Sequence, residues 1–197
     1  FRRNRSLRTF VKRFFLLLTI FLAIIYRQAF IARFFQDDYL LLQLAKAGNV
    51  FMPIANFPYR PVSIQVFYGI GLFLFGENPI GFHLLLFGVF IGALWFAFLL
   101  AKIIFKNDFP AKVAVIIFAF NASLFALFYW IAVSYFVLAA FFVFSSCYFF
   151  IRNKKVLSLI LFSLGLLSNE LVIVMPFLLF SLRLVLPIRI KNILWPA

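Results

Sequence analysis

Asp37 and Asp38 are adjacent carboxylates that follow the first long apolar stretch of this 197-residue chain. Carboxylates beside such a stretch are costly unless they are solvated, paired or used in chemistry. One of them could act as a general base that takes a proton from an acceptor hydroxyl, while the other orients it or holds a metal ion. A structural alternative is an aspartate that caps the first turn of a helix. The residue types leave both interpretations open.

Three more polar residues lie in apolar surroundings. Arg60, which follows Tyr59, carries a planar guanidinium that suits a phosphate group, and its alternative role is an anchor beside lipid headgroups. His83 opens a later apolar run, where a polar residue at a helix end is the simpler interpretation. Glu170 interrupts the 27-residue apolar stretch Val156–Leu182. We expect it to face a cavity or a partner, or to mark a structural turn.

Several common catalytic and cofactor motifs are absent from the sequence. A chain with one His and one Cys has no self-contained zinc site of the usual kind. It also has no Gly-Lys-Ser/Thr phosphate loop and no Ser-His-Asp set with a nucleophile elbow. We therefore predict no cofactor, with a divalent cation on the Asp37–Asp38 pair as the open alternative.

The composition places these residues in a membrane protein. Hydrophobic residues make up 66% of the chain and charged residues 12%, against about 45–50% and about 25% in soluble domains. This excess excludes a water-soluble enzyme, a disordered tail and a disulfide-rich secreted scaffold. The net charge of +14 does not indicate a nucleic-acid partner, because six of the 19 basic residues precede the first apolar run and most others flank later runs. Basic residues in such positions are topology signals.

The apolar runs predict the membrane spans. A crossing helix needs about 20 apolar residues, and Phe14–Ala32 and Phe82–Ala101 match one span each. Val113–Ile151 has the length for two spans joined by a tight turn near Tyr129–Ser134, since Tyr and Trp favour the interface. Val156–Leu182 is either one long helix or two short helices that meet at Glu170.

Pro61–Gly76 is apolar but short, begins with Pro and contains three Gly. If it crossed the membrane, the basic clusters after the next two apolar runs would lie opposite the basic N-terminus. If it lies along or dips into the outer surface, 15 of the 19 basic residues lie on the cytoplasmic side, as the positive-inside bias expects. We therefore predict an interfacial or re-entrant helix here.

The same topology leaves one long outer segment, Arg33–Gly81, which holds most of the acidic residues. Within it, Asp37–Asn49 predicts a short juxtamembrane helix, with Gly48 as its terminator and a loop, Phe51–Tyr59, after it. Any chemistry is therefore expected to face outward.

The predicted fold is an all-α, polytopic transmembrane helix bundle with juxtamembrane helices in the first external loop. We expect a multi-pass protein of the cell membrane whose N-terminus is cytoplasmic. We expect a single membrane domain over residues 1–197, and the start at Phe1 together with the end just past an apolar run leads us to expect a fragment of a larger protein.

Four motifs occur in order over residues 14–186. They are Gln36-Asp37-Asp38-Tyr39, Tyr59-Arg60-Pro61-Val62, Leu74-Phe75-Gly76-Glu77-Asn78-Pro79-Ile80-Gly81-Phe82-His83, and Leu167-Ser168-Asn169-Glu170 followed by Met175-Pro176. Their order resembles the GT-C superfamily of membrane glycosyltransferases. The resemblance is strongest to the branch with the protein O-mannosyltransferases, the bacterial aminoarabinose transferase and the dolichyl-phosphate-mannose mannosyltransferase-like proteins.

The resemblance implies a transferase that takes a sugar from a polyprenyl- or dolichyl-phosphate donor and passes it to an acceptor that the sequence does not name. In that family the first acid of the first external loop is catalytic, which corresponds to Asp37, with Asp38 in the place of the adjacent acid. The basic residue before Pro, which contacts the lipid phosphate, corresponds to Arg60, and the basic residue that opens the next span corresponds to His83. Membrane lipid is the other expected partner. Tyr59 and Glu170, in the matching motifs, are further candidates for substrate binding.

Two other classes of protein compete with a transferase. A transporter or flippase fragment would bind a lipid-linked substrate without chemistry, but transport usually places ionisable groups at mid-membrane on broken helices, and here only Glu170 fits that description. A structural subunit would not depend on the aspartate pair at all.

Overall fold

The computed structural model describes residues 2–48, 53, 58–121 and 124–185, and all secondary structure in that part of the chain is helical. The predicted all-α class is therefore confirmed. The elements are α1 (Arg2–Ile25), α2 (Arg27–Phe30), α3 (Asp37–Lys46), the π-helix η1 (Val62–Val66), α4 (Phe67–Phe75), α5 (Pro79–Phe105), α6 (Asp108–Ala119), α7 (Phe125–Tyr129), the 3-10 helix η3 (Ile131–Ser134), α8 (Tyr135–Ile151), α9 (Lys155–Leu166), the 3-10 helix η4 (Glu170–Val174) and α10 (Met175–Val185).

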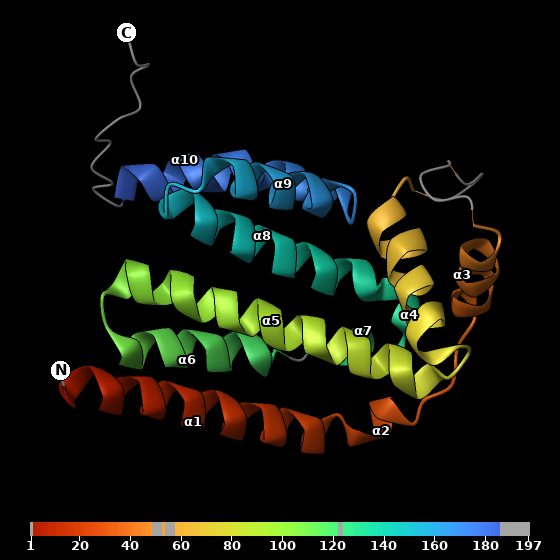
Figure 1. Cartoon of the computed structure of the whole chain (residues 1–197), viewed down its shortest axis with the longest axis horizontal. Helices are drawn as coiled ribbons and strands as arrows, with labels where there is room; N and C mark the ends of the chain where they lie inside the picture. Colours follow the sequence, from red (N-terminus) through yellow and green to blue (C-terminus); the bar gives the residue numbers. More distant parts are fainter. Residues whose placement is uncertain (1, 49–52, 54–57, 122–123, 186–197) are drawn as a thin grey trace, which may run out of the picture.

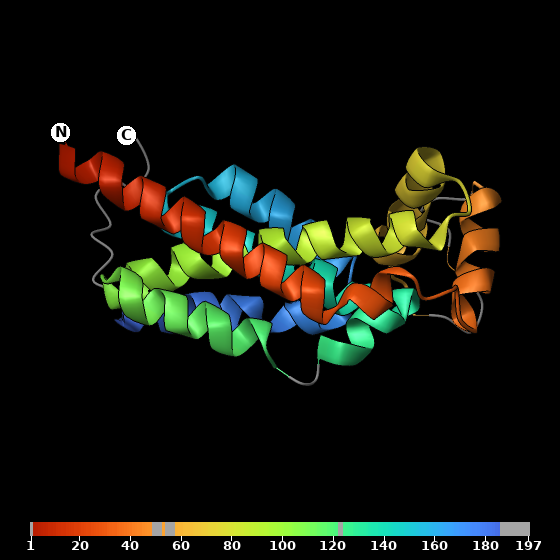
Figure 2. The ribbon, with the colours of Figure 1, turned by 90° about the horizontal axis from the view of Figure 1, so that it is seen from below.

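The longer helices form an elongated bundle. Helices α1, α5, α6, α8, α9 and α10 run along the long axis, and Figure 1 shows α3 and α4 set across one end of it. The view from below agrees, with α3 again upright at the far end from the N-terminus (Figure 2). We call the end that carries α3 and α4 the α3–α4 end. The turns α5–α6 and α8–α9 lie at the opposite end, near the N-terminus.

The two ends of the bundle differ in charge. Basic residues of the α5–α6 and α8–α9 turns lie at the end near the N-terminus: Lys102, Lys106, Arg152, Lys154 and Lys155. Four of the five acidic residues, Asp37, Asp38, Glu77 and Glu170, lie in segments at the α3–α4 end. Asp108 is the exception, and its carboxylate pairs with Lys102 at 2.6 Å. The predicted sidedness rests on this separation and stays a prediction.

Among the described residues, two helices are by length and composition apolar enough to cross a membrane, namely the 27-residue α5 and the 21-residue stretch Ile131–Ile151, which joins η3 and α8. The predicted run Phe82–Ala101 lies inside α5. The turn predicted near Tyr129–Ser134 is confirmed, because Trp130 is extended, with φ −122° and ψ 104°, between α7 and η3.

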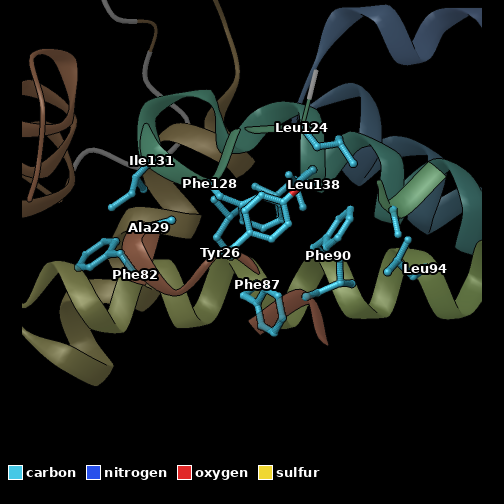
Figure 3. Close-up of a cluster of buried hydrophobic side chains, with 14 of the residues drawn as sticks. Tyr26, Ala29, Phe82, Phe87, Phe90, Leu94, Leu124, Phe128, Ile131 and Leu138 are labelled. Atoms are coloured by element: carbon cyan, nitrogen blue, oxygen red, sulfur yellow. The ribbon is translucent and has the colours of Figure 1, made fainter. Parts of the chain in front are cut away.

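The predicted boundaries of two other runs were wrong. Phe14–Ala32 is not one helix, because α1 starts at Arg2 and ends at Ile25, and Tyr26 separates it from α2. The ring of Tyr26 packs 4.3 Å from that of Phe128, between centroids, in the buried aromatic cluster of Figure 3. A contact between distant segments accompanies this break, so the apolar run alone does not reveal it.

The first half of Val113–Ile151 also differs from its prediction as a full span. The helix there, α6, has only 12 residues and starts at Asp108, where the side chain of Asn107 accepts the N–H of Phe109 at 2.9 Å. It ends at Ala119, and the short α7 follows. The polar cap therefore begins the helix upstream of the apolar run.

Val156–Leu182 forms two helical segments, which decides between the two alternatives. Helix α9 ends at Leu166, and the side chain of Asn169 then accepts the N–H of Leu171 at 2.9 Å to start η4. Glu170 is thus the first residue of η4 and lies at the α3–α4 end, not in the middle of a long helix.

The segment Arg33–Gly81, which we predicted to lie outside, has the predicted short helices. Helix α3 begins at Asp37, and Gly48 follows it with a positive φ of 72°. The predicted loop Phe51–Tyr59 and Asn49 lie largely outside the described residues. Pro61–Gly76 forms η1 and α4, and the axis of α4 crosses the end of the bundle in Figure 1.

Candidate functional site

Asp38 lies in the first turn of α3, and its carboxylate is fully buried. Its side chain has 0% exposure, and its oxygens accept the N–H of Phe35 at 2.9 Å and the hydroxyl of Tyr68 at 2.8 Å. The backbone N–H of Ala132 also donates to it. Burial raises the pKa of Asp38, and these three hydrogen bonds oppose that rise. Asp38 therefore ties α3 to α4 and to η3.

Asp37 has the opposite environment. It is exposed in the first turn of α3, and its carboxylate has no hydrogen bond or ion pair with the described residues. Consecutive residues of a helix point about 100° apart, so when Asp38 faces the interior Asp37 faces outward. A carboxylate in the first helical turn is also favoured by the helix dipole. Asp37 is thus open to a ligand from outside the protein.

Arg60 pairs with Glu170 across a sequence separation of 110 residues. Its Nε donates to Oε2 at 2.7 Å, and its Nη2 donates to Oε1. The guanidinium also lies over the ring of Tyr135, with Cζ 4.1 Å from the centroid. The side chain of Arg60 is 13% exposed and that of Glu170 is 61% exposed. The Arg60 guanidinium therefore packs against the protein, whereas the Glu170 carboxylate is exposed to solvent.

This ion pair changes the protonation of both groups. The Arg60 guanidinium lowers the pKa of Glu170 to about 2, mainly through the hydrogen bonds between them. The same hydrogen bonds raise the pKa of Arg60. Both groups are therefore charged at neutral pH, and the site carries a matched pair of charges.

Backbone contacts beside the ion pair join the same two segments. The N–H of Val62 donates to the carbonyl of Leu167 at 3.1 Å. The hydroxyl of Ser63 donates to the carbonyl of Ser168 at 2.8 Å. The start of η1 is thus attached to the α9–η4 turn by bonds that do not involve the side chain of Glu170.

Asp38 and Arg60 contact the same short segment, residues 132–135. Ala132 donates to Asp38, and Tyr135 lies under Arg60. At a rise of about 2 Å per residue in a 3-10 helix, these two positions are about 6 Å apart along the segment. Two of the motifs singled out in the sequence therefore lie at one end of the bundle, close to η3 and the start of α8.

His83 and Tyr59 are placed differently from each other. His83 is 2% exposed, and its Nε2 lies 3.2 Å from the carbonyl oxygen of Ala32, so it joins α5 to the segment after α2. Tyr59 is 51% exposed, beside Arg60 in the chain. His83 is therefore a buried link, while Tyr59 presents its side chain to the surroundings.

Sequence reasoning did not single out Tyr68, Tyr135 or Ser63. A Tyr within an apolar helix usually needs a partner for its hydroxyl, and this signal could have pointed to Tyr68. Nothing in the sequence pairs Tyr135 with Arg60. Within the described residues, no three His, Cys, Asp or Glu side chains are grouped so that they could hold a metal ion.

Comparison of the chain with protein-family models, with curated proteins and with solved structures found no match.

Proposed function

We propose that this chain is part of a membrane glycosyltransferase that uses a lipid-phosphate sugar as donor. The observation that carries the proposal is the exposed, unpaired state of the Asp37 carboxylate among the described residues, at the same end of the bundle as Arg60. A base near the nucleophile and a cation near the leaving group are the two charges that such a transfer needs. The motif order that resembles the GT-C superfamily supports the same reading.

The proposed topology puts this end outside the cell. The basic residues of the α5–α6 and α8–α9 turns lie at the end near the N-terminus, which the positive-inside bias assigns to the cytoplasm. The α3–α4 end then faces outward, and α3, η1 and α4 lie along the outer surface. Helix α5 and the stretch Ile131–Ile151, which are long enough to cross a membrane, run between these ends.

In the proposed reaction, the hydroxyl oxygen of the acceptor attacks the anomeric carbon of the sugar. The bond from that carbon to the phosphate oxygen breaks, and its electron pair leaves with the lipid phosphate. The proton of the hydroxyl passes to the carboxylate of Asp37, and the configuration at the anomeric carbon inverts. Each atom and charge is thereby accounted for without a cofactor.

The other residues have supporting roles in this proposal. Arg60 stabilises the negative charge of the departing phosphate, and Tyr59 lies beside it as a contact for the donor. Asp38, which is buried and bonded by three donors, holds the first turn of α3 so that Asp37 points outward. His83 fixes the start of α5 against the segment after α2.

The test uses membranes that contain the natural full-length protein and radiolabelled polyprenyl-phosphate sugars. Asp37→Asn should reduce labelling of acceptors by roughly 10²–10⁴-fold, because it removes a general base. Glu77→Gln, which removes another exposed carboxylate at the same end, is the control and should leave labelling unchanged. Unchanged transfer by Asp37→Asn would remove Asp37 from this role. Movement of the lipid across the membrane without acceptor labelling would favour a transporter instead.

A further inference from the structure

The Arg60–Glu170 pair occupies the place where the proposed function requires a phosphate group. Arg60 presents Nε and Nη2 to two oxygens of one carboxylate. This is the same fork that binds two oxygens of a phosphate. Two anions cannot occupy this Nε–Nη2 edge at once, so the protein's own carboxylate and the ligand compete for it.

We propose that Glu170 is a displaceable anion that closes the Arg60 site until a lipid phosphate replaces it. This inference rests on the proposed function and adds to it how the site is regulated. The ligand class is a phosphate mono- or diester with at least two free oxygens on one phosphorus. In the closed state the Glu170 carboxylate accepts the hydrogen bonds from Nε and Nη2 of Arg60, and in the open state the phosphate oxygens accept them.

The difference in burial between the partners decides which one moves. The Arg60 side chain is 13% exposed and lies over the ring of Tyr135, so the protein holds it in position. Glu170 is 61% exposed, and it can turn into water without burying an unpaired charge. Displacement therefore leaves an oriented guanidinium facing the outer side of the bundle.

The backbone does not need to move for this exchange. The bonds from Val62 to Leu167 and from Ser63 to Ser168 hold the two segments together whether or not the side chains are paired. Asn169 caps η4 through its own side chain, so the first turn of η4 also survives the loss of the ion pair. A rotation of the Glu170 side chain is sufficient to open the site.

A proton does not open the site in the physiological range. The groups that face Glu170 are Arg60 and, through Arg60, the ring of Tyr135. Because Arg60 lowers the pKa of Glu170 to about 2, this carboxylate stays charged at any pH near neutrality. The competing phosphate is then the agent that displaces it.

The experiment measures binding of undecaprenyl phosphate to the protein in phosphatidylcholine nanodiscs, with inorganic phosphate in a second arm to separate a lipid ligand from a free ion. Glu170→Gln should bind the lipid phosphate about three- to tenfold more tightly, because the competing charge is gone. Arg60→Gln should lose binding of the lipid phosphate, both in the otherwise wild-type protein and in combination with Glu170→Gln. Glu77→Gln, which removes a carboxylate that pairs with Lys46 at the same end, is the matched control and should bind like the wild type.

The outcomes separate this inference from the proposed function. Equal or weaker binding by Glu170→Gln, with thermal stability retained and with loss in Arg60→Gln, would overturn the displaceable anion and leave the phosphate site standing. Binding that does not depend on Arg60, or no binding by any variant, would overturn both. Tighter binding by Glu170→Gln in a protein that transfers no sugar would support the displaceable anion and overturn the transferase. Tight binding of inorganic phosphate alone would overturn the lipid as the ligand.

Discussion

Tyr68 donates its hydroxyl hydrogen to Oδ1 of Asp38 at 2.8 Å, and neither side chain has any exposure to solvent. The bond joins α3, which carries Asp37, to α4, which lies across the end of the bundle. Burial and the nearby carboxylate both raise the pKa of Tyr68, so the hydroxyl keeps its proton and remains a donor. Asp37 therefore depends on a buried neighbour for its outward orientation.

Tyr68→Phe should destabilise the protein, because it leaves one oxygen of a buried carboxylate without its donor. The expected loss is about 1–3 kcal/mol, measured as a lower unfolding temperature in detergent. Tyr39→Phe is the control, because Tyr39 is 55% exposed in α3, beside Asp38 in the chain, and its ring contact with Phe34 survives the change. Equal unfolding temperatures for both variants would mean that the Tyr68–Asp38 bond contributes nothing to stability.

The main features of the fold could be predicted from local signals in the sequence. Gly48 ends α3 with a positive φ, as a helix terminator should. The 27 residues of α5 contain a long uncharged apolar run, and Pro61–Gly76 was too short and too rich in Gly for a span. The sidedness rests on the positions of basic residues and stays a prediction. Each of these structural features is predicted by residues that lie within the same segment of the sequence.

The features that could not be predicted depend on contacts between distant segments. The break at Tyr26 packs against Phe128, and the pairing of Arg60 with Glu170 spans 110 residues. The residue types alone did not show which of the two aspartates is buried, because the donors from Tyr68 and Ala132 that surround Asp38 come from distant segments.

The ion pair of Glu170 should make a pH-dependent contribution to stability. Its pKa in the folded protein, about 2, is below the ordinary value of 4.5. A lowered pKa gives stability that is complete above the ordinary value and is lost as the pH falls toward the folded value. The difference in unfolding temperature between wild type and Glu170→Gln should thus be constant above about pH 5.5 and should shrink between about pH 4.5 and about pH 2.

The size of that difference should be modest. Glu170 is 61% exposed, and exposed ion pairs are screened by water, so we expect less than about 1 kcal/mol. Unfolding temperatures measured in buffers of equal ionic strength test the shape of the curve. A difference that grows as the pH falls would contradict the sign of the pKa shift.

The proposed topology predicts opposite accessibility at the two ends of the bundle. Glu77→Cys, in the α4–α5 turn, should react with a membrane-impermeant maleimide on intact cells, and Lys106→Cys, in the α5–α6 turn, should react only after permeabilisation. Both variants carry Cys147→Ala, since Cys147 is the single native cysteine and is buried. Labelling of Lys106→Cys on intact cells would contradict the proposed topology, because it would place the α5–α6 turn outside the cell.

Two glycines of α4, Gly71 and Gly69, should respond oppositely to substitution by Ala, because only Gly71 packs closely against α5. A Cβ on Gly71 would lie 2.3 Å from the ring of Phe82, whose side chain is fully buried, so the two helices would have to separate. Gly71→Ala should therefore cost about 1–3 kcal/mol by overpacking. Gly69 lies in the same helix, and a Cβ there meets no atom within 4 Å.

Gly69→Ala should be neutral or stabilising by up to about 1 kcal/mol, because Ala restricts the unfolded chain more than Gly and favours the helix. Unfolding temperatures of the two variants, measured side by side in detergent, give the comparison. Because α4 carries Tyr68, Gly71→Ala should also weaken the hold on Asp38, and acceptor labelling should fall with it. Equal stability of the two alanine variants would mean that α4 does not pack on Phe82 as closely as 2.3 Å implies.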